Sequence, residues 1–176
     1  TGFSVDVCQR WEQALFDAEV SVRRVALRTG MVFGRGNEGV CAAFYHLVKR
    51  GLGGTIGKGN QLVSWIHLDD LCASVQWIIE SHALSGAINA TAPEPLSNRL
   101  LMEIYRHEMG VKVGLPASQW MLEIGAFFMQ TETELLLKSR YVVPKRLLNS
   151  GFVFQYPSFS KALHAILNHP EGHGFG

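Results

Sequence analysis

Two segments in the middle of the chain constrain its fold more than any others, because they predict a strand, a capped helix and a second strand in close succession. The first, 64–71 (SWIHLDDL), places residues suited to a strand directly before two aspartates that can cap a helix. The apolar residues of that helix share one face: Leu71, Val75, Ile78 and Ile79. The second, 87–95 (AINATAPEP), begins with a run too short for a helix and ends in a loop with two prolines. This order of elements predicts an α/β fold.

Length and composition describe a globular protein. The chain has 176 residues, of which 47% are hydrophobic and 18% charged, so it can bury a core and is neither disordered nor fibrous. A net charge of +1 gives no electrostatic support for binding nucleic acid or an anionic membrane surface. The longest apolar run, 120–129, is interrupted by Glu123 and is shorter than the roughly 20 residues of a bilayer span. We therefore expect neither a nucleic-acid partner nor a membrane.

The cysteines indicate a reducing environment. Cys8, Cys41 and Cys72 are odd in number, far apart in the sequence and lack a CxxC pair. This spacing disfavours both a disulfide framework and a zinc site. We expect a cytoplasmic protein without a bound metal.

Periodicity and capping signals predict the remaining elements. Helices are expected at 4–18, 40–49, 70–82, 98–110, 118–138, 145–149 and 159–168, and strands at 24–33, 61–67 and 87–91. Ser97 would cap the fourth helix, which would stop at Gly110. The type of predicted element changes after Pro116, from alternating strands and helices to helices alone. This change predicts an α/β domain over 1–115 and a small, mostly helical domain over 116–176.

As a set, these motifs resemble the C-terminal half of the extended short-chain dehydrogenase/reductase proteins, the NAD(P)-dependent epimerase/dehydratase family. The motifs that carry the resemblance are 3–12 (FSVDVCQRWE), 27–30 (LRTG), 64–70, 89–95, 143–147 (VPKRL) and 151–152 (GF). The chain is most similar to an atypical branch, labelled as sugar-nucleotide epimerases of uncertain substrate, that ends in a small domain of unknown function. The resemblance implies a partial Rossmann-like parallel sheet with covering helices plus a small helical C-terminal subdomain, and a nucleotide-binding half upstream.

The same resemblance leaves the catalytic residues unknown. Extended members of the family carry a Glu four residues after the catalytic Lys, on the helix that corresponds to the first one here. With Glu12 in that place, Cys8 stands at the Lys position and Ser4 at the Tyr position. A Ser hydroxyl is far less acidic than a phenol, and a thiol carries no positive charge. This departure argues against ordinary oxidation or epimerisation.

Two short patterns offer alternatives that their contexts disfavour. Segment 141–145 (YVVPK) has the YxxxK spacing of the family's catalytic pair, but Pro144 disfavours a helical Val143, so the two side chains should not stack on one helix face. Segment 34–39 (GRGNEG) matches the GxGxxG pattern that places a pyrophosphate at a helix N-terminus. The helix after it leads into the glycine-rich loop 51–60, where a Rossmann unit would need a second parallel strand. We treat the first match as coincidence and the second as a loop.

The strand end 28–32 is the expected site of cofactor contact. It matches the family's Arg-x-Gly-x-Val, which runs past the nicotinamide, so the resemblance implies cofactor contacts at Thr29, Gly30, Met31 and Val32. Gly30 would permit close backbone approach, and its two successors would pack against the ring. The alternative is an ordinary buried strand with Gly30 as a bulge.

On the substrate side the candidates are Gly53, Gly54, Lys58, Ser64 and Trp65. Lys58 could meet an anionic group as a point charge. Sugar-nucleotide epimerases often carry an Arg just before the Ile-His motif, whereas Leu62 and Val63 occupy that stretch here, which disfavours a UDP-sugar. His67 could act as a general base; a structural His beside an Asp69 or Asp70 cap is preferred.

Three functions remain as hypotheses. The first is the substrate-side portion of an NAD(P)-dependent nucleotide-sugar epimerase-like protein that acts on an unidentified small molecule. The second is a non-catalytic NAD(P)-dependent binding or sensing protein without the Tyr/Lys proton-transfer pair. The third is a protein-interaction domain built on the apolar helix around 120–129. NADP is preferred over NAD, and this chain alone should bind neither tightly nor turn over. Its sheet should expose an edge, which we expect self-association or an upstream Rossmann segment to cover.

Overall fold

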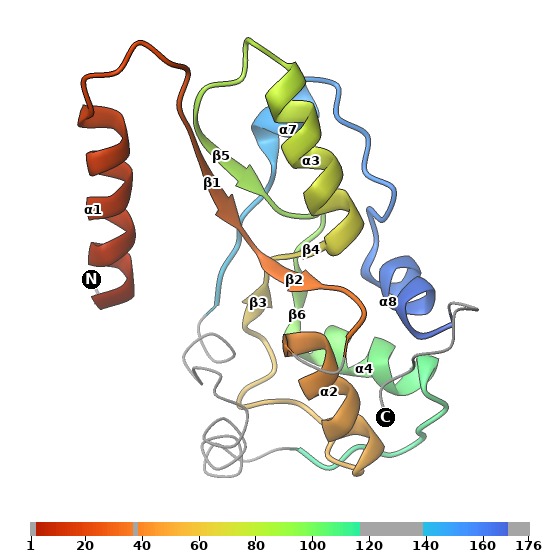
Figure 1. Ribbon diagram of the computed structural model, residues 1–176. Coiled ribbons are helices and arrows are strands. Elements are labelled where there is room, and N and C mark those ends of the chain that lie inside the picture. Colours follow the sequence, from red (N-terminus) through yellow and green to blue (C-terminus); the bar gives the residue numbers. More distant parts are fainter. Residues whose placement is uncertain (1–2, 37–38, 117–138, 169–176) are drawn as a thin grey trace.

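The computed structural model describes residues 3–36, 39–116 and 139–168 (Figure 1). Its helices are α1 (Phe3–Asp17), α2 (Gly39–Lys49), α3 (Leu68–Glu80), α4 (Asn98–Glu108), α7 (Lys145–Asn149) and α8 (Phe159–Leu167). Its strands are β1 (Val25–Thr29), β2 (Met31–Phe33), β3 (Leu62–Val63), β4 (Trp65–His67), β5 (Gly86–Ala90) and β6 (Leu96–Ser97). The predicted helix at 118–138, and with it the apolar run 120–129, lies outside the described residues.

The strands form two parallel pairs and one antiparallel pair. β1 pairs with β5 in parallel from Val25 opposite Gly86 to Thr29 opposite Ala90, and β2 pairs with β4 in parallel. β3 and β6 pair antiparallel, which the sequence did not indicate. Helices α2, α3 and α4 lie around these strands (Figure 1). The predicted α/β class, with parallel strands and covering helices, is confirmed.

Each of the two longest predicted strands is interrupted, and the two interruptions face one another. The strand predicted at 24–33 breaks at Gly30, where the chain leaves β5 and begins to pair with β4. The strand predicted at 61–67 breaks at Ser64, whose carbonyl accepts a hydrogen bond from Met31 N at 2.9 Å. A Cβ built at Gly30 would lie 2.8 Å from that carbonyl oxygen, so only glycine fits without a shift. The sequence predicted both strands as continuous, and in this detail the prediction is wrong.

The cap of α3 also differs from the prediction. His67, not an aspartate, caps the helix: its Nδ1 accepts a hydrogen bond from Asp69 N at 3.1 Å. Asp70 is 2% exposed, and its carboxylate accepts hydrogen bonds from the backbone N–H groups of Gln155 at 2.8 Å and Tyr156 at 2.9 Å. Asp70 therefore fixes the C-terminal segment on α3 instead of capping it. By contrast, the predicted Ser97 cap of α4 is confirmed, with its hydroxyl accepting from Leu100 N.

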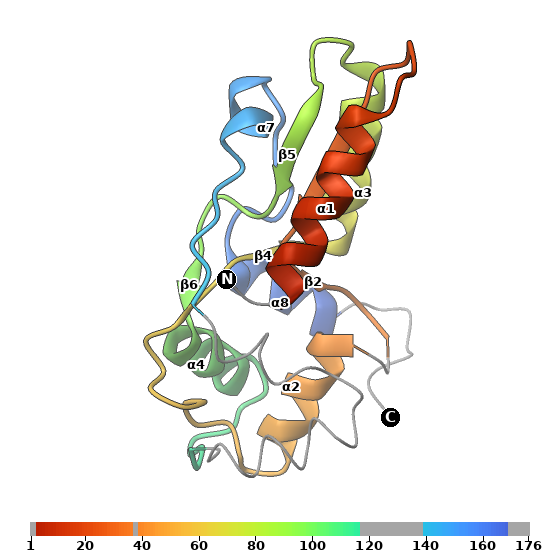
Figure 2. The ribbon, with the colours of Figure 1, turned by 90° about the vertical axis from the view of Figure 1, so that its left-hand side faces the viewer.

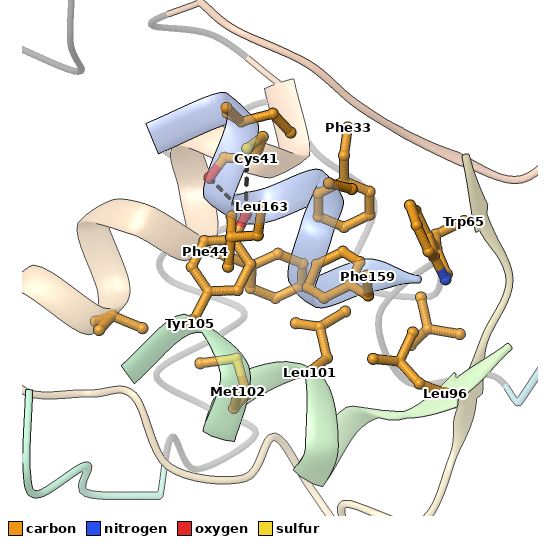
Figure 3. Close-up of a cluster of buried hydrophobic side chains, with 14 of the residues drawn as sticks. Phe33, Cys41, Phe44, Trp65, Leu96, Leu101, Met102, Tyr105, Phe159 and Leu163 are labelled. Carbon is orange, nitrogen blue, oxygen red and sulfur yellow. Dashed lines mark hydrogen bonds between the residues drawn. The ribbon is translucent and has the colours of Figure 1, made fainter. Parts of the chain in front are cut away.

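One buried cluster joins the strands to the last helix of the chain. This aromatic cluster comprises Phe33, Cys41, Phe44, Val48, Ile56, Val63, Trp65, Ala92, Leu96, Leu101, Met102, Tyr105, Phe159, Ala162, Leu163 and Ile166. Figure 3 shows Phe159 of α8 among Phe33, Trp65 and Tyr105. Its ring meets those of Phe33 and Trp65 nearly at right angles, each with a centroid distance of 4.9 Å. Such edge-to-face pairs contribute about 0.5–1.5 kcal/mol beyond the area they bury.

A second buried cluster lies on the other side of the short strands. It comprises Ile66, Ile78, Leu84, Ile88, Ala90, Leu147, Phe152 and Phe154. Leu147 brings α7 onto β5, where Arg146 donates a hydrogen bond to the carbonyl of Ala87 at 2.9 Å. Segments from both sides of residue 115 thus share both clusters. The domain boundary at 115/116 stays a prediction.

Helix α1 stands apart from both clusters, at one edge of the molecule beside β1 (Figures 1 and 2). Its apolar residues are exposed, with Phe3 at 86% and Trp11 at 72%. Polar contacts hold it instead: Arg24 donates to carbonyls at the end of α1, and Arg28 of β1 pairs with Glu12. Among the helices of the described residues, none combines the length and apolar character that crossing a bilayer requires.

Candidate functional site

A cavity of about 680 Å³ opens where the strands are interrupted. Its walls are 28–31, 62–64, Asn89, Thr91, 140–143 and Lys145. Thr29 and Ala90 end the parallel strands β1 and β5, so the cavity lies outside the carboxyl ends of that pair. In open α/β sheets this is the edge at which ligands bind. The volume falls in the range of small-molecule sites.

One wall of the cavity is an irregular segment, 139–143, which we call the strap. Ser64 holds it twice: its hydroxyl donates to the carbonyl of Arg140 at 2.8 Å and accepts from Val142 N at 2.9 Å. Thr91 and Asn89 donate to the carbonyls of Val142 and Val143, at 3.2 and 3.3 Å. Side chains of β5 and of residues beside β4 and β5 therefore fix the strap by its backbone. The Ser139 hydroxyl also holds it, accepting from Leu62 N at 3.0 Å, whereas the exposed side chains of Arg140 and Tyr141 can face a ligand.

The expected cofactor residues are divided by the structure. Thr29, Gly30 and Met31 line the cavity. Val32 does not; it packs against the second cluster, next to Ile66 and Ile88. The space beside Gly30 is filled by Ser64 and by the Thr91 side chain, which explains the glycine without any ligand. The assignment of these four residues to a cofactor stays a prediction.

The expected substrate residues are divided as well. Ser64 lines the cavity, whereas Trp65 is fully buried in the aromatic cluster and its indole donates to the carbonyl of Glu94 at 3.0 Å. Gly53 and Gly54 are buried elsewhere, packed against 114–116, with Gly54 N donating to Leu115 O. Lys58 is exposed on the loop before β3 and does not line the cavity. The structure thus brings Ser64 to the site with Thr29, Gly30 and Met31, and leaves the others away from it.

Helix α1 reaches the cavity through one ion pair. Arg28, on the cavity wall, donates from Nε to Glu12 Oε1 at 2.6 Å and from a terminal nitrogen to Oε2 at 2.5 Å. The hydrogen bond from Arg28 lowers the pKa of Glu12, and the same bond raises the pKa of Arg28. Cys8, one helical turn before Glu12, is a free and exposed thiol. The predicted helix that corresponds to the family's catalytic helix is present as α1, with Cys8 at the Lys position; the side chain of Ser4 is not among those that the structure describes.

Comparisons with known proteins identify the family and the fold. Residues 117–166 match the model of a domain of unknown function, DUF1731. Epimerase family protein ML0860 of Mycobacterium leprae is 32% identical over 97% of this chain and 55% of its own length. The crystal structure of human epimerase family protein SDR39U1 with NADPH superposes with a TM-score of 0.83 and 28% identity, over 94% of this chain and 55% of that one. The chain is an SDR39U1-like member of the NAD-dependent epimerase family.

The resemblance inferred from the sequence motifs is thereby confirmed. This epimerase-family chain spans about half the length of the curated relatives it matches. A nucleoside-diphosphate sugar epimerase from Corynebacterium glutamicum also superposes, with a TM-score of 0.73 and 28% identity, over 95% of this chain and 31% of that one. The comparisons establish the family and the fold; the residues of the site are argued from the cavity alone.

In this epimerase-family chain, the YxxxK match does not form a helical pair. Tyr141 lies on the strap and Lys145 begins α7, so the two are not on successive turns of one helix, as Pro144 predicted. Both nevertheless line the cavity. The sequence missed this site because its walls come from segments that are separated along the chain. Only the proline, which forces an irregular segment, signalled that 139–143 would be available as a wall.

Neither His67 nor the described residues of the 34–39 segment, 34–36 and Gly39, line the cavity. His67 is 6% exposed, and its ring centroid lies 4.0 Å from that of Tyr156 with the two rings tilted by 34°. Burial lowers the pKa of His67, so the ring is neutral at pH 7. Because Nδ1 accepts the cap hydrogen bond, the proton sits on Nε2. The preferred structural role of His67 is therefore confirmed. The prediction that Asp69 or Asp70 caps the helix is wrong, because His67 itself is the cap. No group of three or more side chains able to hold a metal occurs among residues 3–36, 39–116 and 139–168.

Proposed function

We propose that this chain is the substrate-side portion of an NAD(P)-dependent nucleotide-sugar epimerase-like protein that acts on a small molecule. The observation that carries the proposal is the cavity at the carboxyl ends of β1 and β5, with 28–31 on one wall and the strap on another. This is the edge of an α/β sheet where a dinucleotide and its substrate would meet. The family supports the proposal, because a relative was crystallised with NADPH.

Within this proposal the walls have different roles. Thr29, Gly30 and Met31 face the nicotinamide end of the cofactor, and Ser64 orients the strap against the substrate. NADP is preferred over NAD, because NADPH is the cofactor in the human relative's structure. The catalytic residues stay unknown. Three free cysteines suit a cytoplasmic location, although one relative from Arabidopsis is named chloroplastic.

A second candidate is a binding or sensing protein that holds NAD(P) without catalysing proton transfer. The observation that favours it is Cys8, which occupies the Lys position on α1 and offers only an exposed, uncharged thiol. Glu12 at the same helix face is engaged with Arg28. The helix would then transmit the presence of a ligand instead of taking part in a reaction.

Tryptophan fluorescence tests the proposal, since the chain has four tryptophans and Trp65 lies directly after the cavity residue Ser64. NADPH and NADH are titrated into this chain and into a version extended upstream by a nucleotide-binding segment. We expect quenching at micromolar NADPH with the extended version only. Tight binding by this chain alone, or none by the extended version, would contradict the proposal. Substrate-dependent exchange of the hydride of labelled NADPH then separates an enzyme from a sensor.

A further inference from the structure

The charged residues of the cavity are all cations. Arg28, Arg140 and Lys145 line it, and no Asp or Glu does so among the described residues. Arg28 is already engaged by both carboxylate oxygens of Glu12, so its charge is compensated. Neither Arg140 nor Lys145 pairs with any carboxylate of the part of the chain that the structure describes. Two uncompensated positive charges therefore face one cavity, where they raise the local concentration of anions.

The backbones that carry these two cations are held in place. Arg140 N donates to Leu62 O at 2.8 Å, and Arg140 O accepts from the Ser64 hydroxyl at 2.8 Å. Lys145 begins α7, which Leu147 anchors with a fully buried side chain. The backbones of Arg140 and Lys145 are thus fixed, while the guanidinium of Arg140 and the ammonium of Lys145 can move to contact a ligand. An Arg fork and a Lys point charge are the two cationic groups that proteins use on phosphate.

Most of the neutral polar side chains of the cavity are engaged with the strap, and the hydroxyls of Thr29 and Tyr141 are the exceptions. The hydroxyls of Ser64 and Thr91 and the amide of Asn89 are all engaged with the strap backbone. Much of the remaining wall is apolar, with Met31, Val63 and Val143 among its residues. The two cations are then the charged groups available to a polar ligand, with the hydroxyls of Thr29 and Tyr141 beside them, while the apolar wall suits a ring. A cyclic organic phosphate has both properties.

We propose that Arg140 and Lys145 form a subsite for a phosphate group of the small molecule bound in this cavity. This deepens the proposed function and depends on it only for the source of the phosphate, which is either the substrate or the dinucleotide. Neither Arg140 nor Lys145 lies at the end of a strand or within the segment 28–32 that is expected to contact the cofactor. Strand β3 (Leu62–Val63) has no charged residue. Arg140, whose backbone N–H donates to Leu62 O, supplies a positive charge next to it.

The test compares two double variants with equal loss of charge. Arg140→Gln with Lys145→Gln removes both cations of the subsite, and Arg50→Gln with Lys161→Gln removes two exposed cations that do not line the cavity. Calorimetry measures the affinity of each for pyrophosphate. We expect the subsite variant to bind at least about tenfold more weakly than wild type, since hydrogen bonds to charged groups contribute about 1.5–3 kcal/mol. The control should match wild type, and Lys145→Arg should retain most of the affinity.

Three results separate the outcomes. Equal weakening in both double variants would mean a general charge effect and would overturn the subsite, as would absence of pyrophosphate binding by wild type at millimolar concentration. Titration of UDP and of NADPH into the extended version, with and without the same substitutions, then identifies the source of the phosphate, because only the true ligand loses affinity with the subsite. The two proposals can fail separately. If the subsite variant loses pyrophosphate affinity but the extended version shows no hydride exchange, the subsite is supported and the epimerase-like function is not.

Discussion

Helices α1 and α8 present the same sequence signal with opposite outcomes. Apolar residues at helical spacing predicted both. Helix α8 buries its apolar face, so that Phe159 is 4% exposed and Leu163 fully buried. Helix α1 leaves Phe3 and Trp11 largely exposed and is held by ion pairs and hydrogen bonds. Periodicity tells that a helix has an apolar face; only the other segments of the molecule decide whether that face is covered.

The largest expected effect lies on the buried side of this comparison. Phe159→Ala removes the ring that meets both Phe33 and Trp65 edge-on. We expect the free energy of unfolding to fall by about 3–5 kcal/mol, which is the usual loss for a large core side chain. Urea denaturation followed by tryptophan fluorescence measures it. The matched change on α1, Trp11→Ala, should stay within about 0.5 kcal/mol. Equal losses would break the comparison.

A smaller loss is expected where the C-terminal segment is fixed to α3. Asp70→Asn keeps the shape of the side chain but replaces a carboxylate oxygen with an NH₂ group, which cannot accept from Gln155 N or Tyr156 N. We expect a loss of about 1–3 kcal/mol, since a buried donor then lacks its partner. Thermal unfolding by circular dichroism measures it. Asp69→Asn, at an exposed neighbour, is the control and should unfold nearly as wild type does.

The exposed side of the comparison predicts association. Helix α1, with its exposed apolar residues, stands beside β1 at one side of the molecule (Figure 1), and among the described residues β1 pairs only with β5. We expect the chain to self-associate in a concentration-dependent way, and Trp11→Glu to weaken that association about tenfold, or roughly 1.4 kcal/mol. Light scattering after size-exclusion chromatography measures both. A wild-type chain that stays monomeric at high concentration would contradict this prediction.

The smallest effect concerns the ion pair that connects α1 to the cavity. The pKa of Glu12 is lowered in the folded chain, so its contribution to stability is present above the ordinary value of 4.5 and is lost as the pH falls through the folded value. Because the side chains of Arg28 and Glu12 are 56% and 25% exposed, solvent screens the pair, and Glu12→Gln should lose less than about 1 kcal/mol at pH 7. The difference in melting temperature between wild type and variant should shrink as the pH falls below 4.5 and vanish once the pH is below the lowered pKa of Glu12. A difference that persists there would assign the effect to packing.

The sequence predicted the parts of this fold that depend on local patterns. It predicted the six described helices to within about two residues, the parallel α/β class and the family. It failed where a contact comes from a distant segment. Asp70 has the chemistry of a helix cap, and only the fold brings Gln155 and Tyr156 within its reach, so that His67 caps α3 instead.

The candidate site shows the same division. Of the predicted residues 29–32, which belong to a motif that is continuous along the chain, Thr29, Gly30 and Met31 line the cavity and Val32 does not. The strap could not be predicted, because nothing in its sequence indicates that Ser64, Asn89 and Thr91 would hold its backbone. Arg140 went unnoticed for this reason, whereas Lys58, in a glycine-rich loop with a suggestive pattern, drew attention and lies away from the cavity. A wall that is held through its backbone groups is hard to predict from its side chains, because every residue type carries the same backbone groups.

The break at Gly30 has a consequence for how proteins of this family can diversify. The same residue ends one strand pairing, starts another and forms part of the cavity wall, so a larger side chain there would separate the strands and distort the cavity together. That wall is therefore not available for adjusting ligand preference. The strap is available at 140–143, whereas the Ser139 hydroxyl helps to hold it by accepting a hydrogen bond from Leu62 N at 3.0 Å. Evolutionary change in specificity should accumulate over 140–143 while Gly30 stays invariant.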